Sequence, residues 1–133
     1  MVGPSTDTRQ PTADTLDAAA LETLRGMLAD AEPGMMAALL DALFEDAPRL
    51  VEQMRSGISE GNAELTQRAA HTLKSDAAQF GALRLADHCR ELEYLARSGS
   101  LGGAGALLTA VEEAWSEASS ALLALRPQPE ESA

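Results

Sequence analysis

The residues around His71 have the types and the spacing needed to hold a negatively charged group. Arg68 precedes His71 by three residues and Lys74 follows it by three, so the three side chains share one face of a helix. Ser75 and Ala78 continue that face with small side chains, which leave room for a partner molecule. A neutral imidazole near pH 7 has a nucleophilic nitrogen without the help of a general base. This pattern is suited to accepting a phosphoryl group, whose roughly two negative charges nearby cations can stabilise.

The segment that contains His71 is predicted to be an amphipathic helix with the histidine on its exposed face. At about 100° per residue, the apolar positions span about one third of the circumference, and His71 lies about 180° from their centre. The apolar positions are Leu65, Ala69, Leu73, Ala77 and Phe80. A histidine in this position faces water instead of the core. By spacing alone, however, Arg68 and Lys74 are equally well explained as the solvated face of an ordinary helix.

Four further helical segments are expected to position this one. Asp17 is a suitable N-cap for a short first helix, Pro33 suits the first position of a second helix, and Pro48 should kink that helix. Gly61 is expected to end the second helix, and Asn62 is a suitable N-cap for the helix of His71, which Gly81 ends. Apolar residues then recur at helical spacing from 85 to 96 and from 107 to 125. The predicted fold class is all-α, an antiparallel up-down four-helix bundle with an additional short N-terminal helix.

Length and composition support one acidic helical domain. The 133 residues fit a single core, and a hydrophobic fraction of 45% with only 3% aromatic residues favours helices over strands. We assign residues 15–126 to the bundle and expect flexible tails at 1–14 and 127–133, where apolar periodicity is lacking. The net charge of −11 argues against nucleic acid and membrane surfaces as partners. The chain shows no secretory signal or spanning segment, so we expect a cytoplasmic location.

The run from Ala70 to Gly81, which contains His71 and Lys74, is followed by Leu85 and by Cys89-Arg90-Glu91-Leu92-Glu93. This stretch resembles the signature of the histidine-containing phosphotransfer (HPt) domains of multistep phosphorelays, and a wider match runs from about Leu16 to Leu125. The family implies a four-helix core, His71 as the phosphoacceptor and Lys74 as a supporting cation. It also implies an amide near the histidine ring, a role that we assign to Gln79, and we count Arg68 among the phosphoryl-supporting residues.

The resemblance further implies a partner that docks around the exposed histidine. We place this docking surface on Gln67, Ser75, Ala78 and Ala82. Two positions depart from the family pattern: Ser75 replaces the usual glycine, and Asp76 replaces a small residue. Because Asp76 projects only about 40° from the centre of the apolar stripe, its carboxylate needs a partner, and we expect an ion pair with a nearby arginine. A partner-specific or degenerate function is the alternative reading of Asp76.

Other residues that could do chemistry are better explained as structure. His88 has no lysine three residues later and is expected at the surface or the core boundary, and Cys89 is expected in the core. Met27, Met35, Met36 and Met54, which occur at helical spacing, are interpreted as core residues, not as a copper site. No Glu-x-x-His motif accompanies the many carboxylates, so we expect neither a metal nor another cofactor on this chain.

Two functional classes remain open at this point. The chain is either a phosphoryl carrier that exchanges the group on His71 with receiver domains, or an HPt-like binding module that docks a kinase or receiver without carrying phosphate. His71 with Lys74 favours the carrier, because a binding module needs neither residue. In the carrier, catalysis and Mg²⁺ belong to the receiver domain of a response regulator or hybrid histidine kinase, and the chain, expected to be a monomer, is not itself an enzyme.

Overall fold

The computed structural model describes residues 15–125 as five helices. The helices are α1 (Ala18–Met27), α2 (Met35–Glu60), α3 (Ala63–Gln79), α4 (Leu83–Arg97) and α5 (Ala104–Leu125). No strand occurs within the described residues, which confirms the all-α fold class. The tails expected at 1–14 and 127–133 lie outside the described residues, as does Arg126, the last residue of the expected bundle.

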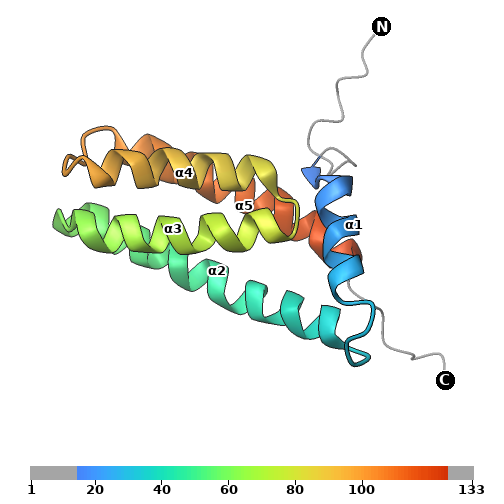
Figure 1. Cartoon of the computed structure of the whole chain (residues 1–133). Helices are drawn as coiled ribbons and strands as arrows, with labels where there is room; N and C mark the ends of the chain where they lie inside the picture. Colours follow the sequence, from blue (N-terminus) through green and yellow to red (C-terminus); the bar gives the residue numbers. More distant parts are fainter. Residues whose placement is uncertain (1–14, 126–133) are drawn as a thin grey trace, which may run out of the picture.

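The four long helices form an antiparallel bundle, with α1 across one end. Figure 1 shows that α2 to α5 alternate in direction and that α3 lies between α2 and α4. One continuous core of leucine, alanine, valine and methionine side chains fills the bundle, including Leu40, Met54, Leu73, Leu92 and Leu122. The core prediction was wrong for Met27 and Met35, which are 62% and 37% exposed because they lie at the last position of α1 and the first of α2. The segment predicted around His71 is α3, and its N-cap is Asn62, whose side chain accepts a hydrogen bond from the Leu65 N–H.

The second helix begins slightly later than its sequence indicates. Pro33 lies outside α2, because Gly34 has a left-handed backbone (φ 90°) and is the N-cap of the helix, which starts at Met35. The helix then continues through Pro48 to Glu60, so the proline does not end it. As expected, Gly61 follows the helix with a positive φ of 71°, a conformation that glycine adopts without steric cost.

The turn between α3 and α4 supports α1. Asp17 caps α1 as predicted, since its carboxylate accepts a hydrogen bond from the Ala20 N–H at 2.9 Å. The Asp17 N–H donates to the Gly81 carbonyl at 2.7 Å. Gly81 has a φ of 79°, and a Cβ there would lie 2.8 Å from the Asp17 carbonyl oxygen, so both conformation and space require glycine. Through this contact α1 covers the end of the bundle near the carboxyl end of α3.

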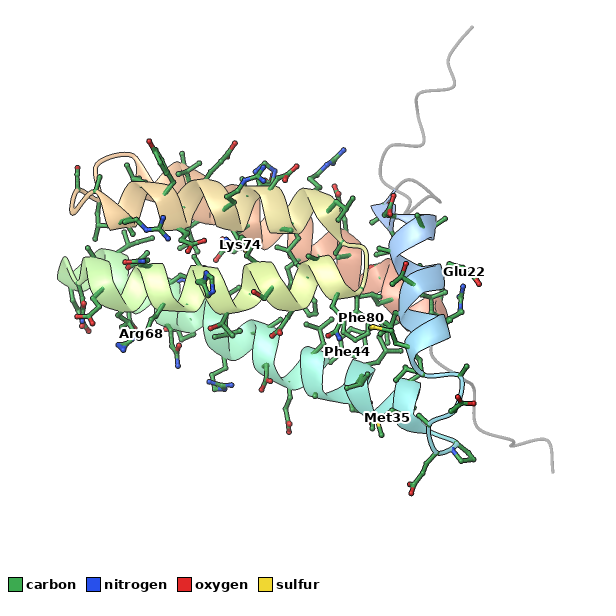
Figure 2. The ribbon with its side chains drawn as sticks, viewed as in Figure 1. Glu22, Met35, Phe44, Arg68, Lys74 and Phe80 are labelled. Carbon is green, nitrogen blue, oxygen red and sulfur yellow. The ribbon has the colours of Figure 1, made fainter. Side chains whose placement is uncertain are left out.

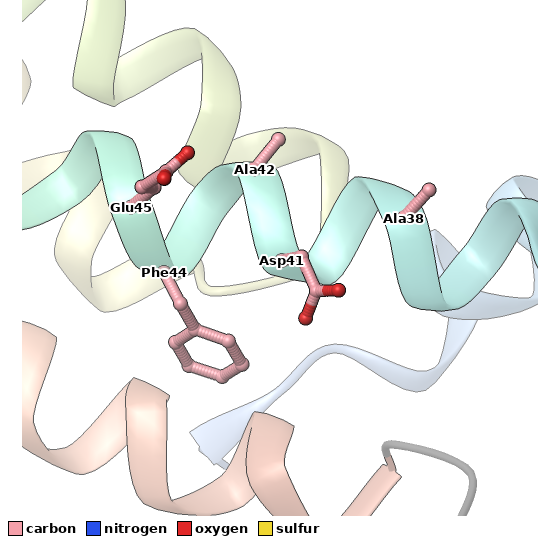
Figure 3. Close-up of a pocket in the computed structure, with 5 residues that line it drawn as sticks. All are labelled: Ala38, Asp41, Ala42, Phe44 and Glu45. Atoms are coloured by element: carbon pink, nitrogen blue, oxygen red, sulfur yellow. The ribbon is translucent and has the colours of Figure 1, made fainter.

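A surface pocket lies on α2 and shares no residue with the site predicted around His71. It is lined by five residues of α2, namely Ala38, Asp41, Ala42, Phe44 and Glu45. Figure 3 shows the Phe44 ring pointing toward α5, where it packs against Trp115 with ring centroids 5.8 Å apart. This contact joins α2 to α5. No residue predicted to take part in phosphoryl chemistry lines the pocket.

Candidate functional site

His71 lies on the exposed face of α3, as its position opposite the apolar stripe predicts. Its side chain is 58% exposed, and its Nδ1 atom lies 2.8 Å from Oε2 of Glu93 on α4. An ionised carboxylate accepts hydrogen bonds and cannot donate them, so Nδ1 carries the hydrogen. In the neutral ring the Nε2 atom then holds the free lone pair. Within the described residues, the structure records no hydrogen bond to Nε2.

Glu93 is the buried centre of the site, with only 3% of its surface exposed. Its Oε1 atom pairs with Nζ of Lys74 at 2.7 Å, and its Oε2 atom accepts a hydrogen bond from Arg97 at 2.9 Å in addition to that from His71. One carboxylate therefore joins two residues of α3 to a cation at the end of α4. This arrangement fixes the ring plane and the tautomer of His71 before any partner arrives.

The charge of Glu93 is maintained by its donors. Burial by itself raises the pKa of a carboxyl group, but the hydrogen bonds from Lys74 and His71 outweigh burial and lower the pKa of Glu93 below its ordinary value. Glu93 is therefore ionised at neutral pH. Glu93 was not among the site residues predicted from the sequence, although a carboxylate at a core-facing position of α4 is a signal that cations must lie nearby.

The two cations predicted beside His71 lie on different sides of it. Lys74 reaches toward α4 and is 29% exposed, whereas Arg68 is exposed on the edge of α3 that faces α2 (Figure 2). The ion pair with Glu93 occupies Lys74 only in part, because an ammonium group has three hydrogens to donate. The site thus holds its lysine close to the imidazole while the arginine stands apart.

The predicted docking residues are only partly brought together. Ser75 and Ala78 are exposed on the face of His71, and Gln67 is half-buried on the same helix. For Ala82 the prediction was wrong. Only 2% of its surface is exposed, because it is the N-cap of α4 in the turn that α1 covers. Gln79 is exposed but lies eight residues from His71, about 12 Å along the helix axis, so the structure does not bring its amide to the ring.

The expected ion pair of Asp76 is absent. Among the described residues, no arginine or lysine pairs with this half-buried carboxylate. Partial burial raises the pKa of Asp76, and the negative charge of Asp46 on α2 raises it further. The prediction was wrong because it rested on α3 alone, whereas the charge that faces Asp76 comes from the neighbouring helix. Asp76 is a local cost to stability at neutral pH.

We expect Asp76→Asn to stabilise the fold at pH 7, by at most about 0.5 kcal/mol because the side chain remains accessible to water. Because the pKa of Asp76 is raised, the folded state disfavours the ionised carboxylate. This cost to the free energy of unfolding is present above the folded pKa. The gain should disappear below the ordinary aspartate pKa of 3.8, where the group is protonated in both states. Urea unfolding of parent and variant at pH 7 and below pH 3.8 measures this difference in stability. Asp87→Asn, which removes an exposed ion pair with Arg90, is the control and should not stabilise.

The remaining candidate residues lie outside this cluster. His88 is 30% exposed, and its buried Nδ1 has no hydrogen-bond partner in the described residues; Glu91 is 3.6 Å away. Cys89 is a buried free thiol, as expected, and burial with the charge of Glu93 raises its pKa to about 12, so it stays protonated. Residues 15–125 contain no group of three or more histidine, cysteine or carboxylate side chains that could hold a metal ion.

Comparison with known protein families identifies the bundle. The family model described as the Hpt domain matches residues 38–121, which is more than half of the chain and includes the His71 cluster. The chain belongs to the Hpt domain family. As an Hpt domain it is a phosphotransfer protein of the phosphorelay type, and its bundle and exposed histidine agree with the resemblance seen in the sequence. A search of curated proteins gave no match.

A solved structure is similar to this Hpt domain over nearly its whole length. It is the crystal structure of histidine-containing phosphotransfer protein B (HptB) from Pseudomonas aeruginosa PAO1, with 28% sequence identity and a TM-score of 0.77. The similarity covers 86% of this chain and 96% of that chain. Within the described residues of the Hpt domain, no helix is both long and apolar enough to cross a membrane.

Proposed function

We propose that this Hpt domain accepts a phosphoryl group on Nε2 of His71 from one receiver domain and donates it to another. The observation that carries the proposal is the hydrogen bond between Nδ1 of His71 and the buried carboxylate of Glu93. That bond assigns the hydrogen to Nδ1 and directs the free lone pair of Nε2 to solvent. A histidine that served only to fill the surface would not need a buried carboxylate at 2.8 Å.

The transfer requires no proton movement on this chain. In acceptance, the Nε2 lone pair attacks the phosphorus of a receiver's aspartyl phosphate, the Nε2–P bond forms, and the P–O bond to the receiver's carboxylate breaks. The ring then carries both the phosphoryl group and the Nδ1 hydrogen, and the ring's positive charge is balanced by Glu93. In donation, an aspartate of the second receiver attacks the phosphorus and neutral imidazole leaves. Glu93 therefore supports both directions by holding the same hydrogen.

The remaining residues contribute charge and space. Lys74 has donors free for the phosphoryl oxygens and lies within one helical turn of His71. Mg²⁺ and the catalytic carboxylates are supplied by the receiver, so the domain carries the group without being an enzyme. We expect it to act as a cytoplasmic monomer, without a cofactor of its own. In the alternative, a non-carrying module that docks a kinase or receiver, the Glu93 network could still join α3 to α4, but nothing would require the ring hydrogen of His71 to be held on Nδ1.

The size of residue 75 should control the transfer rate, because Ser75 is exposed one turn from His71 where a receiver must approach to about 3–3.5 Å. We expect Ser75→Gly to keep or raise the rate, at a cost in stability of roughly 0.5–1 kcal/mol relative to alanine. Ser75→Leu should leave the helix intact and slow transfer on the order of a hundredfold. Transfer rates of the Gly, Ala, Ser and Leu variants measure this. Equal rates across the series would place the approach elsewhere.

The experiment that tests the function is a transfer assay with a panel of phosphorylated receiver domains. The purified Hpt domain is mixed with each receiver, and the loss of label from the receiver is followed together with its gain on the chain. If the chain is a phosphoryl carrier, at least one receiver should give acid-labile label on the chain, and that label should pass on to a second receiver. If the chain is only a binding module, it should form a complex with a receiver or kinase but acquire no label.

A further inference from the structure

Arg68 is the one cation of the described chain that has no acidic partner. Every other arginine and lysine in residues 15–125 has a carboxylate within ion-pair distance: Arg25, Arg49, Arg55, Lys74, Arg84, Arg90 and Arg97. Such pairing is expected in a protein with a net charge of −11, where carboxylates greatly outnumber cations. An exposed arginine that remains unpaired in this setting carries a positive charge that is available to another molecule.

Arg68 lines a groove between α2 and α3. The groove is formed by Arg49, Leu50 and Gln53 from α2 and by Leu65, Arg68, Ala69 and Thr72 from α3. Its lining contains two guanidinium groups, an amide and a hydroxyl, but no carboxylate. Because Asp46 neutralises Arg49 at 3.0 Å, the groove has one uncompensated positive charge. It is therefore complementary to a side chain with one negative charge.

The groove lies beside the phosphoacceptor but outside its hydrogen-bond network. Arg68 and Thr72 flank His71 on α3, whereas the groups that hold the imidazole, Glu93 and Lys74, lie on its α4 side. Figure 2 shows Arg68 and Lys74 on opposite edges of α3. A partner that brings a phosphorus atom to within about 3.5 Å of Nε2 also covers a groove that begins one helical turn away.

We propose that this groove is a docking site for an acidic side chain on the surface of the receiver, with Arg68 as its ion-pair partner. The inference rests on the proposed function and specifies how the partner is recognised. Arg68 is then a specificity residue that acts on binding, not a group that stabilises the phosphoryl in transit. An arginine is suited to this role because its planar fork can bind both oxygens of a carboxylate.

Two phosphoryl donors distinguish an effect on docking from an effect on the transfer step. Phosphoramidate is a small donor with no protein surface, and it transfers its phosphoryl group to the imidazole with release of ammonia. A phosphorylated receiver, in contrast, needs the docking site. We expect Arg68→Ala to keep the phosphoramidate rate within about twofold of the parent. The same variant should weaken receiver binding, measured by titration with the receiver that transfers fastest, about tenfold. Arg68→Glu should weaken it further, and added salt should weaken parent binding more than variant binding.

Arg84→Ala is the matched control, since Arg84 is an exposed arginine of α4 that pairs with Glu117 of α5, away from the groove. It should leave receiver binding unchanged. Equal loss of binding in both variants would show a general charge effect and overturn the proposal. Slower phosphoramidate acceptance in Arg68→Ala would overturn it too, because Arg68 would then act on the phosphoryl group. A parent chain that accepts from neither donor would refute the proposed function, whereas unchanged receiver binding in Arg68→Ala would refute the docking site alone.

Discussion

His71→Gln is expected to abolish phosphoryl acceptance while the bundle remains folded. The variant removes the Nε2 lone pair, and the Glu93 carboxylate that remains in the network is buried, with 3% of its surface exposed, so a phosphoryl donor cannot reach it. Because the side chain is 58% exposed and makes one hydrogen bond, to Glu93, the loss of unfolding free energy should stay within about 1 kcal/mol. Transfer from a phosphorylated receiver and urea unfolding, measured on the same preparation, test both parts.

His88→Gln is the matched control for this prediction. His88 is the only other histidine of the chain and lies on α4, and within residues 15–125 no hydrogen bond or ion pair joins it to the Glu93 network. It should accept a phosphoryl group at the rate of the parent. Acid-labile label that persists in His71→Gln, or that is lost in His88→Gln, would move the acceptor to another residue.

Glu93→Gln should slow transfer by on the order of ten- to a hundredfold, although Glu93 never touches the phosphoryl group. A neutral amide can donate to Nδ1 as well as accept from it, so the hydrogen of the ring is no longer confined to Nδ1. When the hydrogen moves to Nε2, the nucleophilic lone pair is lost at that atom. The fraction of each tautomer, read from the ¹⁵N chemical shifts of the imidazole, should change with the rate.

The same variant should be less stable than the parent at neutral pH. Removing one partner of a fully buried ion pair costs about 3–5 kcal/mol, but here the cations left behind reach solvent, so we expect about 1–2 kcal/mol. Because the pKa of Glu93 is lowered in the folded state, its contribution is present above the ordinary value of 4.5 and is lost as pH falls through the folded pKa. The stability difference between parent and variant should therefore close in acid.

Glu91→Gln provides the comparison, since Glu91 is an exposed carboxylate of the same helix, with its Oε1 atom 3.6 Å from Nδ1 of His88. Its transfer rate and imidazole tautomer should equal those of the parent. A Glu93→Gln variant with an unchanged ¹⁵N pattern and an unchanged rate would contradict the positioning role of the carboxylate.

Local pattern was sufficient to predict the helices and the exposure of His71. The apolar stripe from Leu65 to Phe80 determines which face of α3 packs inward, and that face is a property of the segment alone. The caps at Asp17 and Asn62 were predictable for the same reason, since each bonds within its own first turn.

The features that the sequence did not predict depend on how helices pair. Glu93 meets His71 across 22 positions of the chain, through the register of α3 against α4, which no single-helix pattern specifies. Asp76 faces Asp46 instead of an arginine because of the register of α2 against α3. Ala82 was predicted to lie on the docking surface, yet α1 covers the turn that contains it. In each case a second helix decides the environment.

The most direct test of phosphoryl transfer through His71 is to find which atom of the chain carries the phosphoryl group. The ¹⁵N-labelled Hpt domain is phosphorylated by a receiver, or by phosphoramidate, and the imidazole nitrogens are observed by NMR through their coupling to ³¹P. We expect one phosphorylated nitrogen, Nε2 of His71, with the hydrogen retained on Nδ1 beside Glu93. Phosphorus on Nδ1 of His71, on His88, or on no histidine at all would contradict it.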